Sequence, residues 1–152
     1  MLSPQQKARI RPLLRSIAGG GNVLPLAAAR RLAEQEGHCL RAVEDLALEE
    51  GILPQRYERN IGTLGLDGQR RLLAASALVV GAGGLGGYVL ESLARLGVGR
   101  IAAVDNDRFS ETDLNRQLLC DTGNLGLPKV QVATERIARV NPAVEFQAYE
   151  TP

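Results

Sequence analysis

The stretch "VVGAGGLGG" (residues 79–87) decides the fold, because it joins an apolar run to a helical pattern through closely spaced glycines. Gly81, Gly83 and Gly86 satisfy the pattern GxGxxG. Between a strand and a helix, such glycines permit a tight turn, let the backbone approach a phosphate, and bring the helix close to the sheet. The first turn of the helix then offers unpaired N–H groups to an anion. The pattern predicts a nucleotide-binding turn, but NAD, FAD and ATP all remain open.

Apolar runs and amphipathic segments alternate on both sides of this turn. Residues 77–81 are an all-apolar run, typical of a parallel strand that is covered on both faces. Two right-handed strand–helix–strand units predict an α/β fold: a Rossmann-like parallel sheet with strand order 3-2-1, one half of a doubly wound fold. We expect strands at 77–81, 100–105 and 143–149, and helices at 67–76, 85–99 and 127–142.

The N-terminal part of the chain has a different pattern. Short helical segments are expected ahead of "GGGN" (19–22), at 26–37 and at 40–51, and Pro54 closes the series. We therefore expect two domains: a small helical module at 1–54 and a Rossmann-like nucleotide-binding domain at 55–152.

Composition excludes several classes of protein. The 152 residues are 45% hydrophobic and 23% charged, and 18 basic side chains nearly balance 17 acidic ones, which argues against a nucleic-acid or anionic-membrane partner. Neither a membrane span nor a secretory signal is present, so we expect a cytoplasmic protein. Cys39, Cys120 and His38 lack the spacing of a disulfide framework or a zinc site.

The loop after the second expected strand holds groups suited to a nucleotide. Asp105 ends that strand, where it can accept hydrogen bonds from ribose hydroxyls. Arg116 lies in the loop, and Lys129, one of two lysines in the chain, lies in the first turn of the next expected helix. Such a cation pair suits a triphosphate that must lose pyrophosphate better than a dinucleotide that loses hydride. An NAD-linked redox domain remains an alternative, because the glycines and Asp105 fit it as well.

Several motifs occur together in the C-terminal two thirds of the chain. They run from "RYERNIGTLGLDGQRRLLAASALVVGAGGLGG" (56–87) through "DNDRFSETDLNRQ" (105–117) to "GLPKV" (126–130). In order and spacing they resemble the ThiF/MoeB/HesA family, relatives of the ubiquitin-activating enzymes. The resemblance covers residues 56 to about 148.

The resemblance implies adenylation with ATP and Mg²⁺. The C-terminal carboxylate of a ubiquitin-like sulfur-carrier protein ending in Gly-Gly attacks the α-phosphate and gives an acyl-adenylate and pyrophosphate. Asp105 would bind the ribose, Arg116 and Lys129 the phosphates, and Arg59 the phosphates of a neighbouring subunit, which implies a homodimer. The resemblance assigns the nucleotide turn to Gly81, Gly83, Gly84 and Gly86, and places Asp107 and Gln117 in the same motif.

The sequence departs from the family pattern in two ways. Asp113 stands where an asparagine usually faces the nucleotide, and a carboxylate there repels phosphate unless it is turned away or paired. The family's magnesium-binding aspartate, its CxxC zinc pairs and its sulfur-handling cysteine lie beyond the equivalent of Pro152. We therefore expect a fragment that carries the nucleotide-side half of the enzyme, without the zinc site.

A hypothesis of another class comes from "LAEQEGHCLRAVEDL" (32–46), which has the rhythm of a DNA-binding helix-turn-helix and would indicate a nucleotide-sensing regulator. Charge argues against it, because the second helix sets Arg41 against four carboxylates, which DNA phosphates would repel. They are Glu44, Asp45, Glu49 and Glu50. A module that packs on the adenylation domain, extends a dimer interface or docks a carrier is the main interpretation.

Overall fold

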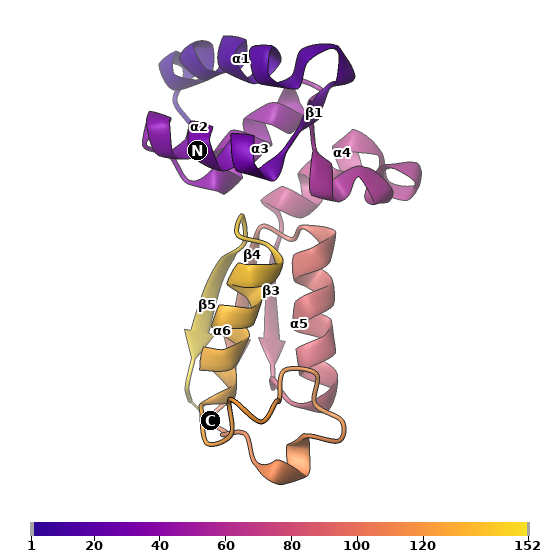
Figure 1. Cartoon of the computed structure of the whole chain (residues 1–152), viewed down its shortest axis with the longest axis vertical. Helices are drawn as coiled ribbons and strands as arrows, with labels where there is room; N and C mark the ends of the chain where they lie inside the picture. Colours follow the sequence, from indigo (N-terminus) through magenta and orange to yellow (C-terminus); the bar gives the residue numbers. More distant parts are fainter. Residues whose placement is uncertain (1, 152) are drawn as a thin grey trace. The chain divides into compact units, whose positions relative to one another are not determined.

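The computed structural model describes residues 2–151 and divides into two compact units, Met1–Ala74 and Ala75–Pro152. The first unit contains α1 (Pro4–Ala18), β1 (Val23–Leu24), α2 (Leu26–Glu36), α3 (Leu40–Glu49), β2 (Leu53–Pro54) and α4 (Ile61–Ala74), with 3₁₀ turns η1 (Gly19–Gly21) and η2 (Gln55–Asn60) (Figure 1).

The three helices expected in the N-terminal region are present, and they enclose a common core. Helix α1 begins with a capping box in which Ser3 and Gln6 satisfy each other's backbone N–H groups. The parallel pairing of β1 with β2 was not expected. The buried core side chains are Ile10, Leu14, Leu24, Ala29, Leu32, Ala33, Val43, Leu46, Ala47 and Ile52.

Helix α3 lies at the centre of this unit. None of its residues is exposed. Glu49 and Glu50 at its C-terminal end accept hydrogen bonds from Lys7, Arg11 and Arg15 of α1. These bonds, from Lys7 to Glu49 and from Arg15 to Glu50 foremost, lower the pKa of both carboxyl groups. Helix α3 therefore has no fully exposed face that could lie in a DNA groove.

Residues 55–74 belong to the first unit. Helix α4 lies against α3 and follows directly on η2, and Tyr57 of η2 is fully buried. Helix α4 is kinked at Gly65, which has a φ of 65°. The structural division after Ala74 thus lies beyond the domain boundary that we expected at residue 54.

The second unit is the expected Rossmann-like half. It contains β3 (Ser76–Val80), α5 (Gly84–Leu96), β4 (Arg100–Val104), the 3₁₀ turn η3 (Glu111–Asp113), α6 (Lys129–Val140) and β5 (Glu145–Tyr149). The strands are parallel and in the order β3-β4-β5, which confirms the predicted topology. Glu91 of α5 joins the two helices by accepting hydrogen bonds from Arg95 and from Arg136 of α6. The bonds from Arg136, and then Arg95, lower the pKa of the Glu91 carboxyl.

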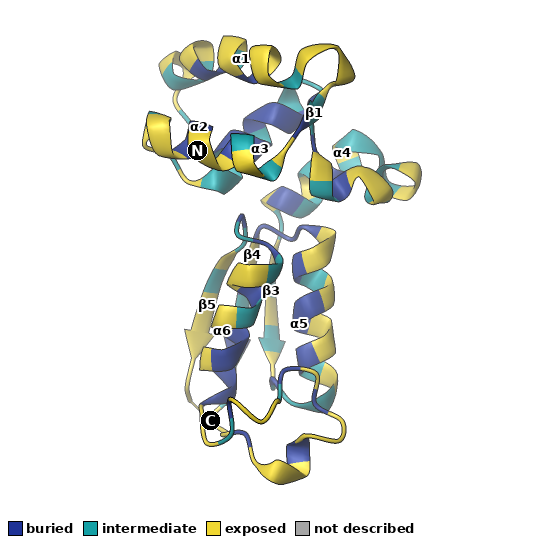
Figure 2. Ribbon diagram, viewed as in Figure 1, coloured by how far each residue is buried: buried dark blue, intermediate teal, exposed yellow. Residues whose placement is uncertain are grey.

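The prediction that strand 77–81 is covered on both faces was wrong. Both crossover helices lie on one face of the sheet, as two successive right-handed connections in the same direction require (Figure 1). On the other face Leu78 is 63% exposed, Val80 78% and Tyr149 47%, and Figure 2 shows exposed and half-buried residues along these strands.

Candidate nucleotide-binding site

The glycine turn, the loop after β4 and the start of α6 gather at the carboxyl end of the parallel sheet (Figure 1). This is the end at which open α/β sheets bind ligands. Gly81 turns the chain out of β3 with a φ of 88°, a conformation that L side chains rarely adopt. A Cβ on Gly86 would lie 1.8 Å from the carbonyl oxygen of Gly81. Glycine at position 86 thus lets α5 start directly against the turn, as the motif predicts.

Asp105 joins the glycine turn to the following loop. Its Oδ2 accepts a hydrogen bond from Ala82 N at 2.6 Å, and its Oδ1 accepts one from Asp107 N at 2.8 Å. A carboxylate oxygen has two acceptor positions, so each oxygen retains capacity for a further donor. Asp105 thereby fixes the backbone of the turn and still presents acceptors to a ribose hydroxyl.

Lys129 pairs with Asp107, which lies in the loop after β4. The Lys129 side chain is 8% exposed, and its Nζ lies 3.2 Å from Asp107 Oδ2. Its backbone N donates to Asp107 O at 2.9 Å, and the ammonium also lies 5.9 Å from the centre of the Phe109 ring. The Asp107 side chain is 66% exposed, so its carboxylate remains in contact with solvent while it pairs with Lys129. Helix α6 begins at Lys129, two residues after the start expected at residue 127, and Pro128 is its N-cap.

Asp113, the departure from the family pattern, is turned inward. Its Oδ2 accepts hydrogen bonds from Ser110 N at 2.9 Å and Ser110 Oγ at 3.1 Å, and Gln117 Nε2 donates to its Oδ1. The two bonds from Ser110, that from its backbone N above all, lower the pKa of the Asp113 carboxyl. The aspartate therefore acts as a cap for the loop and is paired there.

Gln117 connects this cap to the glycine turn. It is 6% exposed, and its Oε1 has no hydrogen-bond partner among the described residues. A Cβ on Gly83 would lie 3.5 Å from that oxygen, so the amide lies directly against the turn. A buried acceptor without a partner is costly, and a donor placed at the turn would satisfy it. Sequence reasoning missed the role of Ser110, although the S-x-x-D spacing at 110–113 was a readable capping signal.

The two predicted arginines are exposed to solvent. Arg116 is exposed and its guanidinium donates to Thr112 O at 2.6 Å and to Asn115 Oδ1 at 3.1 Å, all within its own loop. Arg59 is exposed in η2 of the first unit. The structure therefore brings together the glycines, Asp105, Asp107, Gln117 and Lys129 in one region, and leaves the two guanidinium groups open to solvent.

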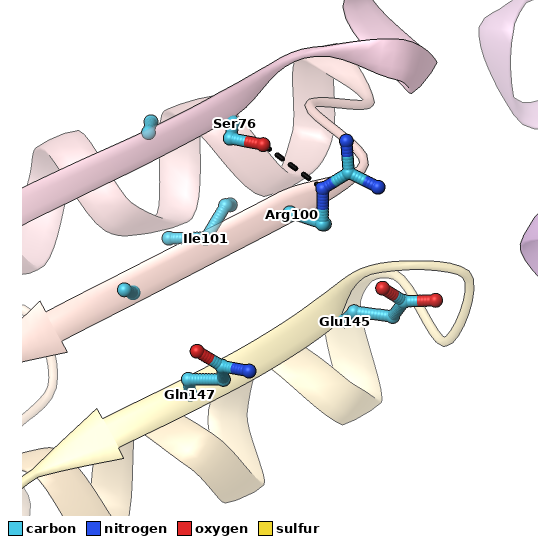
Figure 3. A pocket seen from close by; sticks show the side chains of 7 residues that line it. Ser76, Arg100, Ile101, Glu145 and Gln147 are labelled. Carbon is cyan, nitrogen blue, oxygen red and sulfur yellow. Dashed lines mark hydrogen bonds between the residues drawn. The ribbon is translucent and has the colours of Figure 1, made fainter.

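A pocket of about 160 Å³ lies at the opposite, amino end of the sheet. Figure 3 shows its side chains, with Arg100 Nε donating to Ser76 Oγ at 2.9 Å. Ser76, Arg100 and Glu145 are each the first residue of a strand, so this pocket is separate from the glycine turn. No cluster of metal-ligating side chains occurs within residues 2–151. Cys120 is partly buried, and burial raises the pKa of its thiol, as expected of a structural cysteine.

Sequence comparison assigns this arrangement to a family. The sequence model of the ThiF family matches residues 57–152. The chain belongs to the ThiF family. This ThiF-family chain is 46% identical over 96 residues to a sulfur carrier protein adenylyltransferase of Thermus thermophilus, a match that covers 62% of the chain and 35% of the relative. It is 42% identical over 123 residues to the adenylyltransferase and sulfurtransferase UBA4 of Eremothecium gossypii, covering 79% of the chain and 27% of the relative.

Solved structures of the family have the same fold. The Escherichia coli tRNA N6-threonylcarbamoyladenosine dehydratase in complex with ATP matches with a TM-score of 0.62 and 34% identity, covering 64% of the chain and 40% of that protein. The chain thus spans between about a quarter and two fifths of these relatives. No helix in the described part of the chain is long and apolar enough to cross a membrane.

Proposed function

We propose that this chain is the nucleotide-binding half of a cytoplasmic adenylyltransferase that uses ATP and Mg²⁺ to activate the C-terminal glycine carboxylate of a ubiquitin-like sulfur-carrier protein. The observation that carries the proposal is the buried ammonium of Lys129 in the same region as the glycine turn and Asp105. Relatives named as sulfur-carrier adenylyltransferases support the reaction class, and a relative solved with ATP supports the nucleotide.

The residues present fit a nucleoside triphosphate. The first N–H groups of α5 lack intrahelical partners, and helix N-termini favour anions. The unpartnered Oε1 of Gln117 can accept a hydrogen bond from a donor at the turn. We infer that Gly81, Gly83, Gly84 and Gly86 form the nucleotide turn, that Asp105 accepts from the ribose, and that Asp107 releases Lys129 to the phosphates.

The chemistry requires positioning and charge neutralisation more than an enzyme nucleophile. A carboxylate oxygen of the carrier's last glycine forms a bond to the α-phosphorus, the bond to the bridging oxygen breaks, and pyrophosphate leaves with that electron pair. Lys129 and Arg116 would stabilise the growing charge on the phosphates, and Arg59 of a second copy would do so across a homodimer. Magnesium would supply further charge neutralisation to the phosphates when bound.

Calorimetric titration tests the proposal. We expect ATP with Mg²⁺ to bind the chain, NAD to give no heat, and Lys129→Ala to weaken ATP binding by about 10-fold or more, as the loss of a charged hydrogen bond implies. Arg139→Ala is the matched control, because Arg139 lies exposed near the other end of the same helix. Binding of NAD without ATP would instead support a redox role for the glycine turn.

A further inference from the structure

The segment η2 is held at three of its six positions and exposed at the other three. Tyr57 is fully buried, Arg56 is ion-paired, and Asn60 Nδ2 donates to Gln69 Oε1 of α4 at 2.9 Å. Glu58 and Arg59 between them are exposed. The segment is therefore anchored on both sides of Arg59, and this guanidinium is presented to solvent from a fixed backbone.

The anchor at Arg56 depends on a carboxylate from the N-terminal helices. Glu44 of α3 has no solvent exposure, and its Oε2 accepts a hydrogen bond from Arg56 Nη2 at 2.5 Å. The Arg56 guanidinium also lies 4.6 Å from the centre of the Tyr57 ring. The other oxygen of Glu44 has no hydrogen-bond partner among the described residues. A buried carboxylate with one cationic partner is kept in a single orientation, since every alternative leaves it uncompensated.

This pair lies outside the region matched to the ThiF family, which begins at residue 57. Arg56 and Arg59 are one 3₁₀ turn apart, since that helix has three residues per turn. Holding the first arginine therefore sets the backbone rotation from which the second extends. The N-terminal helices supply the group that does this.

We propose that Glu44 is a positioning residue for Arg59: the buried Glu44–Arg56 pair orients η2 so that Arg59 reaches the triphosphate of a nucleotide bound by a second copy of this chain. The inference rests on the proposed function and adds a role for the N-terminal helices. Without the pair, η2 would sample other orientations, and binding of Arg59 to the phosphates would require a loss of conformational entropy that weakens the affinity.

A double-mutant cycle on ATP binding with Mg²⁺ tests the inference. We expect Arg59→Ala to weaken binding by about 10-fold and Glu44→Gln, which keeps the shape of the side chain, to weaken it by a smaller factor. The double variant should bind no more weakly than Arg59→Ala alone, because Glu44 acts through Arg59. Glu50→Gln is the matched control: Glu50 is also a nearly buried carboxylate beside α3, but it pairs with Arg11 and Arg15 of α1.

Hydrogen exchange supplies a second readout. Glu44→Gln should speed exchange of the backbone amides of residues 55–60 and leave α1 and α2 protected. If Glu44→Gln does not fold, Arg56→Lys replaces it, since a lysine keeps the charge but loses the planar fork and its contact with Tyr57.

The outcomes separate the two proposals. Equal effects of Glu44→Gln and Glu50→Gln, or effects of Glu44→Gln and Arg59→Ala that simply add, would overturn the positioning role. The positioning role would also be overturned if Arg59→Ala binds ATP with unchanged affinity while Lys129→Ala loses binding. That result would still support the proposed function. Absence of ATP binding by the unmodified chain would refute the proposed function and, with it, this inference.

Discussion

Gly86→Ala is the substitution for which the structure gives the sharpest expectation. The new Cβ would lie 1.8 Å from the carbonyl oxygen of Gly81 and 2.7 Å from its carbon, whereas real Cβ contacts essentially never fall under 3.0 Å. The obstacle is backbone, so no side-chain rotation can relieve it. Either the turn or the start of α5 must shift.

The size of the effect follows from this contact. Overpacking a filled site costs about 1–3 kcal/mol, occasionally more. We expect at least the upper value, about 3 kcal/mol, because a shift of α5 also disturbs its contacts with β3 and β4. In a unit of this size each kcal/mol lowers Tm by roughly 4–8 °C, so the unfolding transition of the second unit should fall by more than about 12 °C.

Gly84→Ala is the matched control, since a Cβ there meets nothing within 4 Å. Gly84 is the first residue of α5, and alanine in a helix is more stable than glycine by about 0.5–1 kcal/mol. Differential scanning calorimetry measures both variants, and hydrogen exchange assigns the shifted transition to residues 75–151. A Gly86→Ala protein that melts within about 2 °C of the unmodified chain would refute the close approach of α5 to the turn.

Three further predictions follow from burial and charge. Hydrogen bonds from Arg136 and Arg95 lower the folded pKa of Glu91, so the stabilisation that Glu91 provides is present above the unfolded value of about 4.5 and is lost as pH falls through the folded pKa. The free energy of unfolding in urea should therefore fall between pH 7 and pH 3.5, and this fall should be about 1 kcal/mol smaller in Glu91→Gln than in the unmodified chain. Leu78→Ser with Val80→Thr should reduce binding of the dye ANS without lowering Tm, since both side chains are exposed; a loss of stability would mean that this face is covered. Iodoacetamide should modify exposed Cys39 before Cys120, whose thiol pKa is raised by burial. Peptide mass mapping after short reaction times measures the order, and modification of Cys120 first would contradict the prediction.

The sequence predicts the second unit well because its local signals agree with its topology. Gly81 and Gly86 mark the turn, helical periodicity marks α5 and α6, and the right-handed crossover rule leaves one strand order. The exposed face of the sheet was not predicted. An apolar run such as 77–81 indicates that a strand is suited to burial on both faces, but it does not show which elements pack against each face. Strands β1 and β2 escaped prediction because two residues carry no periodicity.

The places of candidate site residues were predictable where the sequence pattern sets a residue at the end of a strand or in the first turn of a helix. Lys129 in the first turn of a helix and Asp105 at the end of a strand are such cases; the structure shows these places, and the roles of both residues in binding stay predictions. The partners of charged groups were less predictable. From the sequence alone Asp113 is a negative charge near phosphate, and only the structure shows its bonds with Ser110 and Gln117. The ion pair between Asp107 and Lys129 was likewise not predicted.

The first unit also bears on how far the structure that supports the family match extends towards the N-terminus. The family match starts at Tyr57, yet Tyr57 is fully buried in a unit that extends back to the first helix, and the Arg56 guanidinium over its ring is held by Glu44. A chain started at residue 55 would keep Arg56 and lose Glu44, which exposes an aromatic ring and leaves the cation without its carboxylate. Removing one member of a buried pair costs about 3–5 kcal/mol, a large share of the stability of a small domain. We therefore expect the motif that carries Arg59 to depend on the N-terminal helices for its structure, and the functional boundary at residue 54 stays a prediction.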